Sequence, residues 1–423
     1  MAIRSTGELI KQKRWALKIL YELIGIDTVI PPGKNYGKFA NYSAKILKSL
    51  SMHVSVVRVP RSRVEKFYPE YADYPRYVVL AKLGSGRPVL HFNGHYDVVP
   101  AGHGWTHEVF PSKPPRSSTS SDWVYGRGAS DMKGGIAAIM LAVRLLVEAK
   151  REFSGTIEVS LTPDEEIGGH SGLEYVVAQG LSRPDFAVIA EPSGLDRILI
   201  GHKGSLQILV EVYGENAHGS MPWRGKNAFP AMVELASSLE KEYTASVIRA
   251  TKKSNHRYSA SGAERPTIML GGILRGGNQQ NLVPAYSAFS IDRRIIPEEN
   301  PVKVKEQLLH HIVSFAKKNS RMKKHRIECK ILNQVSPAVL APNSRLLKTI
   351  QEIVFSLEGA TPRPEVAVGT MDAGYFLRRG IDTVAYGPGQ LYQAHVADEH
   401  ISMGDVFTAA RIYERLARTL LRC

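Results

Sequence analysis

The stretch PVLHFNGHYDVVP, residues 88–100, begins as a largely apolar run and carries two polar side chains, His95 and Asp97, towards its end. The run has the length of a buried strand, and His95 and Asp97 follow it with one residue between them. In α/β proteins, ligands bind just beyond the carboxyl ends of the sheet strands. This stretch therefore predicts a central strand that delivers two polar groups to a binding site, and the pair indicates half of a metal site.

The surrounding sequence alternates strand-like and helix-like segments. Apolar runs at 77–83, 155–163 and 185–192 predict further strands, and 132–149 has the pattern of a helix. Such alternation is typical of a mostly parallel sheet that is covered by helices on both faces. We therefore expect an α/β domain in which the strand ends gather several polar side chains along one edge. These side chains are His95, Glu165, Glu166 and Glu191.

Residues 203–333 have a different order of elements. A strand, a helix, two strands, a helix and a strand follow one another, which is a βαββαβ unit and predicts an inserted α+β domain. The strands are expected at 205–214, 267–277, 285–294 and 326–332, and the helices at 227–243 and 301–318. A chain of 423 residues also exceeds the size of one hydrophobic core. We predict a discontinuous catalytic domain, residues 1–202 and 334–423, around this insertion.

The last segment completes the first domain in this interpretation. Its apolar residues follow the period of a helix in some stretches and that of a strand in others. Helices are expected at 344–356, 372–379 and from 403 onward, and strands at 364–368 and 383–386.

Composition limits the partners and the compartment. The net charge is +15, but the basic residues form short scattered clusters without zinc-finger spacing or an aromatic ribonucleoprotein motif, so we expect no nucleic-acid partner. Two cysteines, Cys329 and Cys423, cannot form a disulfide framework and favour a reducing cytoplasm. Residues 1–26 alternate charged and apolar side chains at helical spacing, which indicates neither a signal peptide nor a membrane anchor.

Histidines and carboxylates recur in five short motifs along the chain. The motifs are GHYDVVP (94–100), YGRGASDMKGG (125–135), TPDEEIGG (162–169), AEPS (190–193) and AHVADEH (394–400). Nitrogen and oxygen ligands in this mixture suit borderline divalent metals such as zinc. The sequence thus predicts a hydrolase with two metal ions.

The chemistry of such a site follows from the residue types. Two cations about 3.5–4 Å apart can hold a bridging water, lower its pKa and polarise a carbonyl group. Glu165 and Glu166 are adjacent at a strand end, so their side chains cannot point the same way. One can bind a metal while the other acts as general base and later protonates the leaving nitrogen. The expected reaction is hydrolysis of an amide.

The ordered motifs resemble the co-catalytic metallohydrolases that include acetylornithine deacetylase, succinyl-diaminopimelate desuccinylase, aminoacylase and glutamate carboxypeptidase. The resemblance covers nearly the whole chain. It implies that His95 and Glu191 bind one zinc ion, that Glu166 and His395 bind the second, and that Asp131 bridges them.

The resemblance also gives roles to the neighbours of the ligands. Asp97 would hydrogen-bond the far ring nitrogen of His95 and fix its tautomer, and Glu165 would be the general base. A cis peptide bond is implied after Asp131. From its position before a helix, the same aspartate is also expected to be an N-cap.

Further matches lie mainly in the predicted insertion. The segment GENAHGSMP resembles one whose histidine, here His218, reaches the active site of the partner subunit and stabilises an oxyanion. Asn281 and Arg294 match positions that bind a substrate carboxylate, for which a planar guanidinium is suited. Gly369 and Thr370 correspond loosely to a glycine-rich loop near the substrate. The Pro/Ser-rich loop at 111–122 receives no role.

We therefore interpret the chain as a cytoplasmic, homodimeric enzyme with two zinc ions per subunit, for which cobalt or manganese could substitute. It would remove the acyl group from an N-acyl amino acid. The first alternative is a carboxypeptidase or dipeptidase that acts on small peptides. The ligand set does not distinguish this alternative from an enzyme that removes acyl groups. Two others are a catalytically silent binding protein, which would not need Glu165, and a basic nucleic-acid binder, whose affinity would fall steeply with salt.

Overall fold

The structure is a computed structural model, and it describes residues 6–114, 123–150, 153–250 and 253–421. Part of the loop singled out above, residues 115–122, and Cys423 lie outside these ranges.

The chain divides into two compact units. Unit 1 comprises Met1–Ile200, Leu340–Pro364 and Met371–Cys423, and unit 2 comprises Gly201–Val339 and Glu365–Thr370. The grouping puts residues 365–370 with unit 2, although the predicted boundaries assign them to the catalytic domain.

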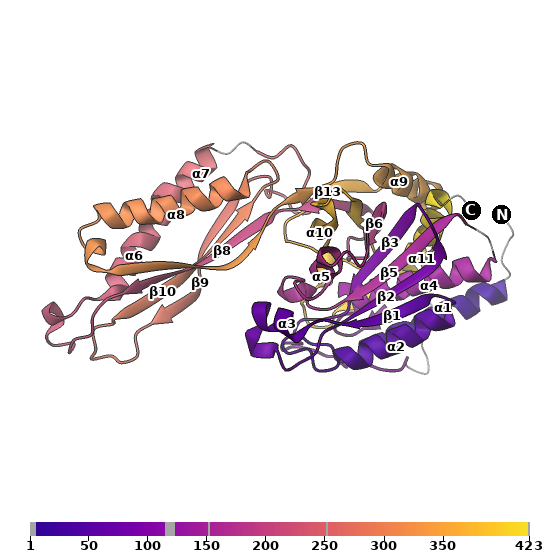
Figure 1. Cartoon of the computed structure of the whole chain (residues 1–423), viewed down its shortest axis with the longest axis horizontal. Helices are drawn as coiled ribbons and strands as arrows, with labels where there is room; N and C mark the ends of the chain where they lie inside the picture. The colour runs from indigo at the N-terminus through magenta and orange to yellow at the C-terminus, as the bar shows by residue number, and fades with distance from the viewer. Residues whose placement is uncertain (1–5, 115–122, 151–152, 251–252, 422–423) are drawn as a thin grey trace. The chain divides into compact units, whose positions relative to one another are not determined.

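A nine-stranded sheet follows the order β1-β2-β5-β3-β6-β14-β7-β12, and β13 also pairs with β7 (Figure 1). The strands are β1 (His53–Arg58), β2 (Tyr77–Ser85), β3 (Val89–His95), β5 (Gly155–Thr162), β6 (Phe186–Ile189), β7 (Arg197–His202), β12 (Ala338–Val339), β13 (Arg363–Ala367) and β14 (Asp382–Ala385). The predicted runs at 88–95, 155–163 and 185–192 are the adjacent strands β3, β5 and β6. Because β3 is parallel to both of the others, their carboxyl ends share one edge.

The sheet is mixed, so the prediction of a mostly parallel sheet was wrong. Parallel pairing joins β5, β3, β6 and β14, whereas β2 pairs antiparallel with both β1 and β5, and β7 pairs antiparallel with β14 and β12. Only residues 86–88 separate β2 from β3. A parallel crossover needs a dozen or more residues, so this short connection reverses the chain.

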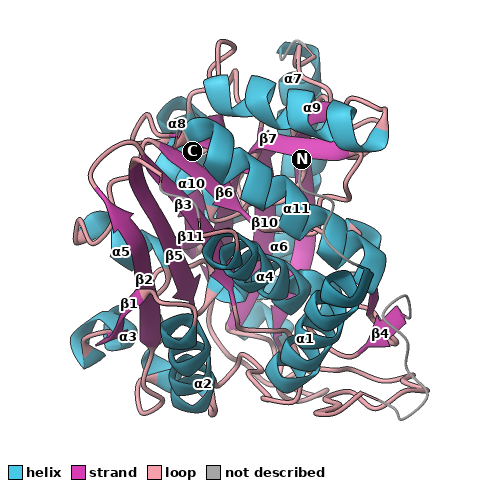
Figure 2. Cartoon of the chain, turned by 90° about the vertical axis from the view of Figure 1, so that its right-hand side faces the viewer, coloured by secondary structure: helices cyan, strands magenta, loops and turns pink. Residues whose placement is uncertain are grey.

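Helices cover both faces of the sheet. Figures 1 and 2 show α1 (Thr6–Ile24), α4 (Gly134–Glu148) and α11 (Met403–Leu420) on one face, with α5 (Leu173–Ala178) and α10 (Ala373–Leu377) on the other. The remaining helices of unit 1 are α2 (Tyr36–Ser49), α3 (Arg61–Phe67) and α9 (Arg345–Glu358).

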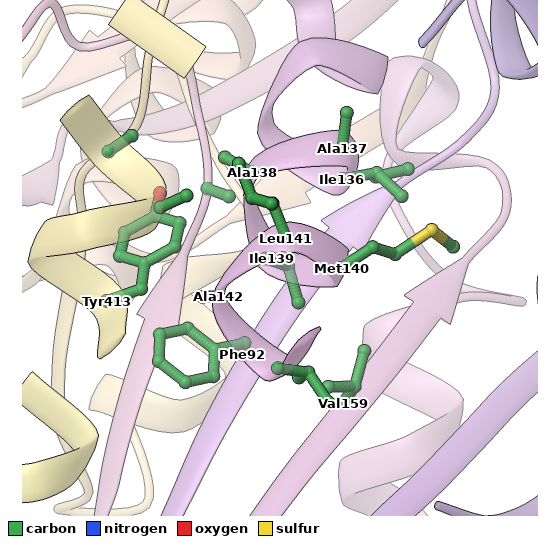
Figure 3. Packing of buried hydrophobic residues seen from close by; sticks show 14 of the residues in the cluster. Phe92, Ile136, Ala137, Ala138, Ile139, Met140, Leu141, Ala142, Val159 and Tyr413 are labelled. Atoms are coloured by element: carbon green, nitrogen blue, oxygen red, sulfur yellow. The ribbon is translucent and has the colours of Figure 1, made fainter. Parts of the chain in front are cut away.

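The apolar helix α4 is the centre of the main core. Its residues 136–142 are at most 2% exposed and pack against Phe92 of β3 and Val159 of β5 (Figure 3). Tyr413 of α11 closes the same cluster, with its ring centroid 5.1 Å from that of Phe92. A helix that is apolar on all sides is stable only when it is buried on all sides. This packing fixes the strands whose ends carry the site.

A two-stranded ladder joins distant parts of unit 1. The strands β4 (Trp123–Tyr125) and β15 (His400–Ser402) pair antiparallel, with His400 opposite Tyr125. The segment before His400 and the segment after Tyr125 therefore lie side by side.

Unit 2 contains a four-stranded antiparallel sheet in the order β11-β8-β10-β9. Its elements are β8 (Gly204–Tyr213), α6 (Ala228–Ser238), α7 (Ala245–Ala250), β9 (Thr267–Gly276), β10 (Tyr286–Ile295), α8 (Pro301–Lys318) and β11 (Arg326–Val335). Alternate β8 residues from Leu206 to Val212 are buried with Leu235 of α6 and Leu308 of α8. The period of two places these side chains on the helix-covered face.

Among the described helices, none is both long enough and apolar enough to cross a membrane.

Candidate active site

One group of polar side chains collects at the carboxyl ends of β3 and β6. His95 is the last residue of β3, Asp131 lies in the short segment η2 (Ala129–Lys133), and Glu191 comes two residues after β6. The His95 Nε2 atom is 3.1 Å from Asp131 Oδ1 and 4.0 Å from Glu191 Oε2. One ligand atom from each residue lies within 4.8 Å of the others, so the three can hold one metal ion.

A second group shares Asp131. The His395 Nε2 atom is 3.0 Å from Glu166 Oε2 and 3.5 Å from Asp131 Oδ2. Since Asp131 offers Oδ1 to the first group and Oδ2 to the second, its carboxylate lies between two possible metal positions. The structure thus brings together the five side chains that the resemblance implies as ligands.

The donor set fits a pair of divalent ions. It offers two imidazole nitrogens and three carboxylates, a mixture that suits zinc. The Glu191 Oε1 atom is buried and has no hydrogen-bond partner among the described residues. An unsatisfied buried acceptor costs about 1–3 kcal/mol. A cation bound there would remove this cost.

Asp97 contacts His95 in a different way from the one expected. The Nδ1 atom of His95 lies 3.1 Å from the backbone oxygen of Asp97 but 3.6 Å from its carboxylate. That carboxylate is buried and accepts the backbone N–H groups of Glu165, at 3.2 Å, and Glu166, at 3.0 Å. Asp97 therefore uses its carbonyl to orient the histidine and its side chain to hold the turn with the two glutamates.

The two glutamates lie in the short helix η3 (Glu165–Ile167) and point to different partners. Glu166 contacts His395, as given above. The carboxylate of Glu165 makes no hydrogen bond or ion pair within the described part of the chain. These contacts are those expected if Glu166 binds a metal and Glu165 stays free to act as a base.

A buried ion pair supports this turn, and sequence reasoning missed it. Asp164 precedes Glu165 and has a φ of 65°. Its Oδ2 atom is 2.8 Å from Arg76 Nε, both side chains are fully buried, and the Tyr36 hydroxyl donates to Oδ1 at 3.1 Å. One sign of this ion pair was visible in the sequence: Asp164 in the motif TPDEEIGG is acidic, but it had been given no role.

Asp131 is not the N-cap of α4, so this expectation was wrong. The cap position is Lys133, without a side-chain capping bond, because η2 separates Asp131 from the helix. The carboxylate instead contacts the two histidines. The Asp131–Met132 peptide bond is cis, as the resemblance implied.

Two predicted residues of unit 2 lie side by side. His218 pairs with Leu282 in an isolated bridge, and the backbone N–H of Gly219 donates to the Asn281 carbonyl at 2.7 Å. Both His218 and Asn281 are exposed, and His218 Nδ1 is 2.8 Å from the Ser220 hydroxyl. Their roles stay predictions.

The other predicted substrate-binding residues occupy separate positions within unit 2. Arg294, the residue before the last in β10, forms an ion pair with Asp292 at 2.9 Å. Gly369 and Thr370 follow β13, and a side chain at Gly369 would meet nothing within 4 Å.

Without metal, the crowded carboxylates and histidines share protons. Hydrogen bonds to Asp131 and Glu166 raise the pKa of His395 to about 10. Burial opposes the charge of His95, but its hydrogen bond to Asp131 and the nearby carboxylate of Asp97, 3.6 Å from Nδ1, outweigh this and raise its pKa. Burial raises the pKa of Glu191 to about 8. At neutral pH the metal-free site therefore holds protons on groups that bind metals only when deprotonated.

We expect metal binding to release protons and to strengthen as the pH rises. Hydrogen bonds raise the pKa of His395 to about 10 and burial raises that of Glu191 to about 8, which favours the protonated form of both groups at neutral pH in the metal-free protein. Each proton displaced makes zinc affinity rise about tenfold per pH unit below these values. Competition with a chromophoric chelator at pH 6, 7 and 8 measures the slope. A zinc affinity that is independent of pH, after correction for the chelator, would contradict this assignment of protons.

A sequence profile described as Peptidase family M20/M25/M40 matches residues 91–419, which include every proposed ligand. The chain belongs to this family. As an M20 family member it is a hydrolase that acts on amide bonds.

Individual relatives agree with this membership. A probable succinyl-diaminopimelate desuccinylase of Staphylococcus aureus (strain MRSA252) is 29% identical over 364 residues, which cover 79% of this chain and 85% of the relative. An M20 family metallo-carboxypeptidase from Sulfolobus solfataricus has a similar structure, with a TM-score of 0.74 and 21% identity over 96% of this chain and 99% of that chain. A dinuclear metal binding peptidase of the M20 family from Bacillus subtilis has a TM-score of 0.67 and 13% identity, covering 97% and 99%.

Proposed function

We propose that this protein is a two-zinc amidohydrolase that cleaves the acyl group from an N-acyl amino acid. The observation that carries the proposal is the shared carboxylate of Asp131, which contacts His95 on one side and His395 on the other. Glu191 and Glu166 complete the two ligand groups. The desuccinylase relative is consistent with an N-acyl substrate. We also propose a cytoplasmic location, on the cysteine content.

Two zinc ions in these groups would supply Lewis acidity that lowers the pKa of a water molecule and polarises the amide carbonyl. The protein's own residues move the protons. Among the described residues, no side chain forms a hydrogen bond or ion pair with the carboxylate of Glu165, and burial raises the pKa of this carboxyl above the ordinary range. Such a carboxylate can accept a proton from the attacking water and return it to the leaving nitrogen near neutral pH. Asp97 holds the turn so that the base faces the site.

Substrate recognition is assigned to residues of unit 2. Arg294 can bind a substrate carboxylate through two parallel N–H groups, for which a guanidinium is suited. Asn281 would add an amide donor, and Gly369 and Thr370 would add backbone and hydroxyl groups. His218 would stabilise the oxyanion of the partner subunit's substrate.

Unit 2 also supports a homodimer. Its edge strand β9 leaves Met269 and Leu274 exposed, at 55% and 68%. On α6, Phe229 and Val233 are likewise exposed. Unpaired strand edges and exposed apolar side chains favour association with another chain. Two-fold dimers are the commonest closed assemblies, so we propose pairing through this unit.

We expect hydrolysis of N-acetyl or N-succinyl amino acids that stops with a strong chelator and returns with zinc, cobalt or manganese. Both ligand groups need metal, because their carboxylates and histidines bind only when deprotonated. The purified protein would be assayed against both N-acyl series and a set of dipeptides, with and without chelator. Faster turnover of dipeptides would favour the peptidase alternative. Full activity in protein shown by elemental analysis to be metal-free would reject the two-metal function.

A further inference from the structure

Glu399 lies four residues after His395, and its buried carboxylate binds the loop that carries Asp131. The Oε1 atom accepts the backbone N–H groups of Ser130 at 2.8 Å and Asp131 at 2.9 Å. The Oε2 atom accepts the backbone N–H of Gly128 at 3.0 Å and the Arg127 guanidinium at 2.7 Å. The Glu399 side chain is about 1% exposed. It therefore braces the loop from inside the protein.

The loop is shaped to receive an anion. Gly126 has a φ of 152° and Gly128 a φ of 84°, values that L residues rarely adopt. A side chain on Gly128 would come within 2.6 Å of Val98. Successive backbone N–H groups that turn inward form a concave anion site. In this protein the anion is the chain's own carboxylate, because Glu399 occupies the position that a bound anion would take.

Arg127 extends this brace to the stretch that follows His95 and Asp97. Its Nη2 atom donates to the carbonyl of Ala101 at 3.1 Å, and its guanidinium lies over the Trp105 ring at 5.2 Å. A buried carboxylate needs such a partner, because removing one member of a buried ion pair leaves an uncompensated charge.

The pairing of β4 with β15 places Glu399 opposite the loop that carries Asp131. The N–H of Gly126 donates to the Glu399 carbonyl at 2.9 Å, next to the pair of His400 and Tyr125. The segment 395–399 thus supplies a proposed metal ligand at one end and the support of the shared ligand at the other.

We propose that Glu399 is a positioning residue that fixes the Asp131 main chain and so sets the affinity of both metal positions together. The inference rests on the two-metal function proposed above. Partners that orient metal ligands typically contribute about 10–100-fold to metal affinity. Because Asp131 faces both groups, loosening it weakens both positions, whereas loss of a ligand from one group weakens that group first.

Glu399→Gln tests this role. Its amide can accept from the loop through one oxygen only, and its NH₂ group faces the donors that the second oxygen had bound. We expect both zinc affinities, measured by chelator competition at one pH, to fall by about 10–100-fold. Glu166→Gln should lower mainly the affinity of the second position. If Glu399→Gln binds both zinc ions as the wild type does, the inference is wrong.

A matched control separates positioning from general destabilisation. Glu158 is also a buried carboxylate, held by Lys82 at 2.8 Å and His91 at 3.2 Å, and it belongs to neither ligand group. Glu158→Gln should lower the Tm of the metal-free protein but keep both zinc affinities. Equal losses of zinc affinity in the two variants would overturn the proposal.

A milder variant covers the case in which Glu399→Gln does not fold. Arg127→Lys keeps the charge beside the carboxylate but loses the fork that reaches Ala101. We expect a smaller fall that affects both zinc affinities, and a fall at one position alone would contradict the proposal. If the wild type binds no zinc, the proposed function itself fails, which is a different outcome from unchanged binding in the variants.

Discussion

Replacing Glu165 with glutamine is expected to lower kcat by about 10²–10⁴-fold or more, while both zinc ions stay bound. The change removes a proton carrier and leaves all five proposed ligands in place. Glutamine has nearly the shape of glutamate, and the N–H of residue 165 can still donate to Asp97. Steady-state kinetics with elemental analysis of the same preparations would measure both effects.

The adjacent glutamate provides the control for this experiment. Glu166→Gln should lower the zinc content at the second position, because its carboxylate contacts His395. The two variants differ by one position on the same turn, so a general disturbance of the turn would affect them alike. If Glu165→Gln loses zinc and Glu166→Gln keeps it, the roles within the pair are reversed.

The fold was predictable where apolar runs were long and uniform. The runs that became β3, β5 and β6 are buried on both faces, so their composition indicated strands without any tertiary information. Strand direction was harder to predict. The antiparallel direction of β2 follows from the three-residue connection between β2 and β3. Strand β1 has mostly exposed residues, so the composition of β1 gave little indication of a strand.

The five proposed ligand residues could be singled out because each stands in a short motif of histidines and carboxylates, and the family resemblance then implied how they divide between two metal ions. Their supports were not predictable in this way. Arg76 and Asp164 are 88 positions apart, and Arg127 and Glu399 are 272 apart. A buried arginine becomes recognisable only when the fold supplies its carboxylate. The same applies to Asp97, whose bonds to the glutamate turn depend on the register of β3 and β5.

These supports have a common arrangement. Asp97 accepts the N–H groups of the turn with Glu165 and Glu166, and Glu399 accepts those of the loop with Asp131. In both cases a buried carboxylate holds the main chain of a proposed ligand. A ligand whose main chain is fixed needs less reorganisation to bind a metal, because the donor atoms already lie close together.

His218→Ala is expected to lower kcat by about 10²–10³-fold without changing zinc content, the usual effect of deleting one oxyanion donor. The residue lies on an exposed turn of unit 2, outside both ligand groups. Under the proposed dimer, it would act on the substrate of the partner subunit. Kinetics and elemental analysis of the variant test the first part of this prediction.

Subunit mixing tests the second part. A heterodimer of His218→Ala and Glu165→Ala subunits would contain one site with both the donor and the base intact, because the two groups would come from different chains. Activity should therefore rise above that of either variant after subunit exchange, towards about half of the wild-type activity per such heterodimer. Mixing two samples of His218→Ala is the control and should restore nothing. If mass measurements show complete exchange but no activity returns, His218 acts within its own chain or has no catalytic role.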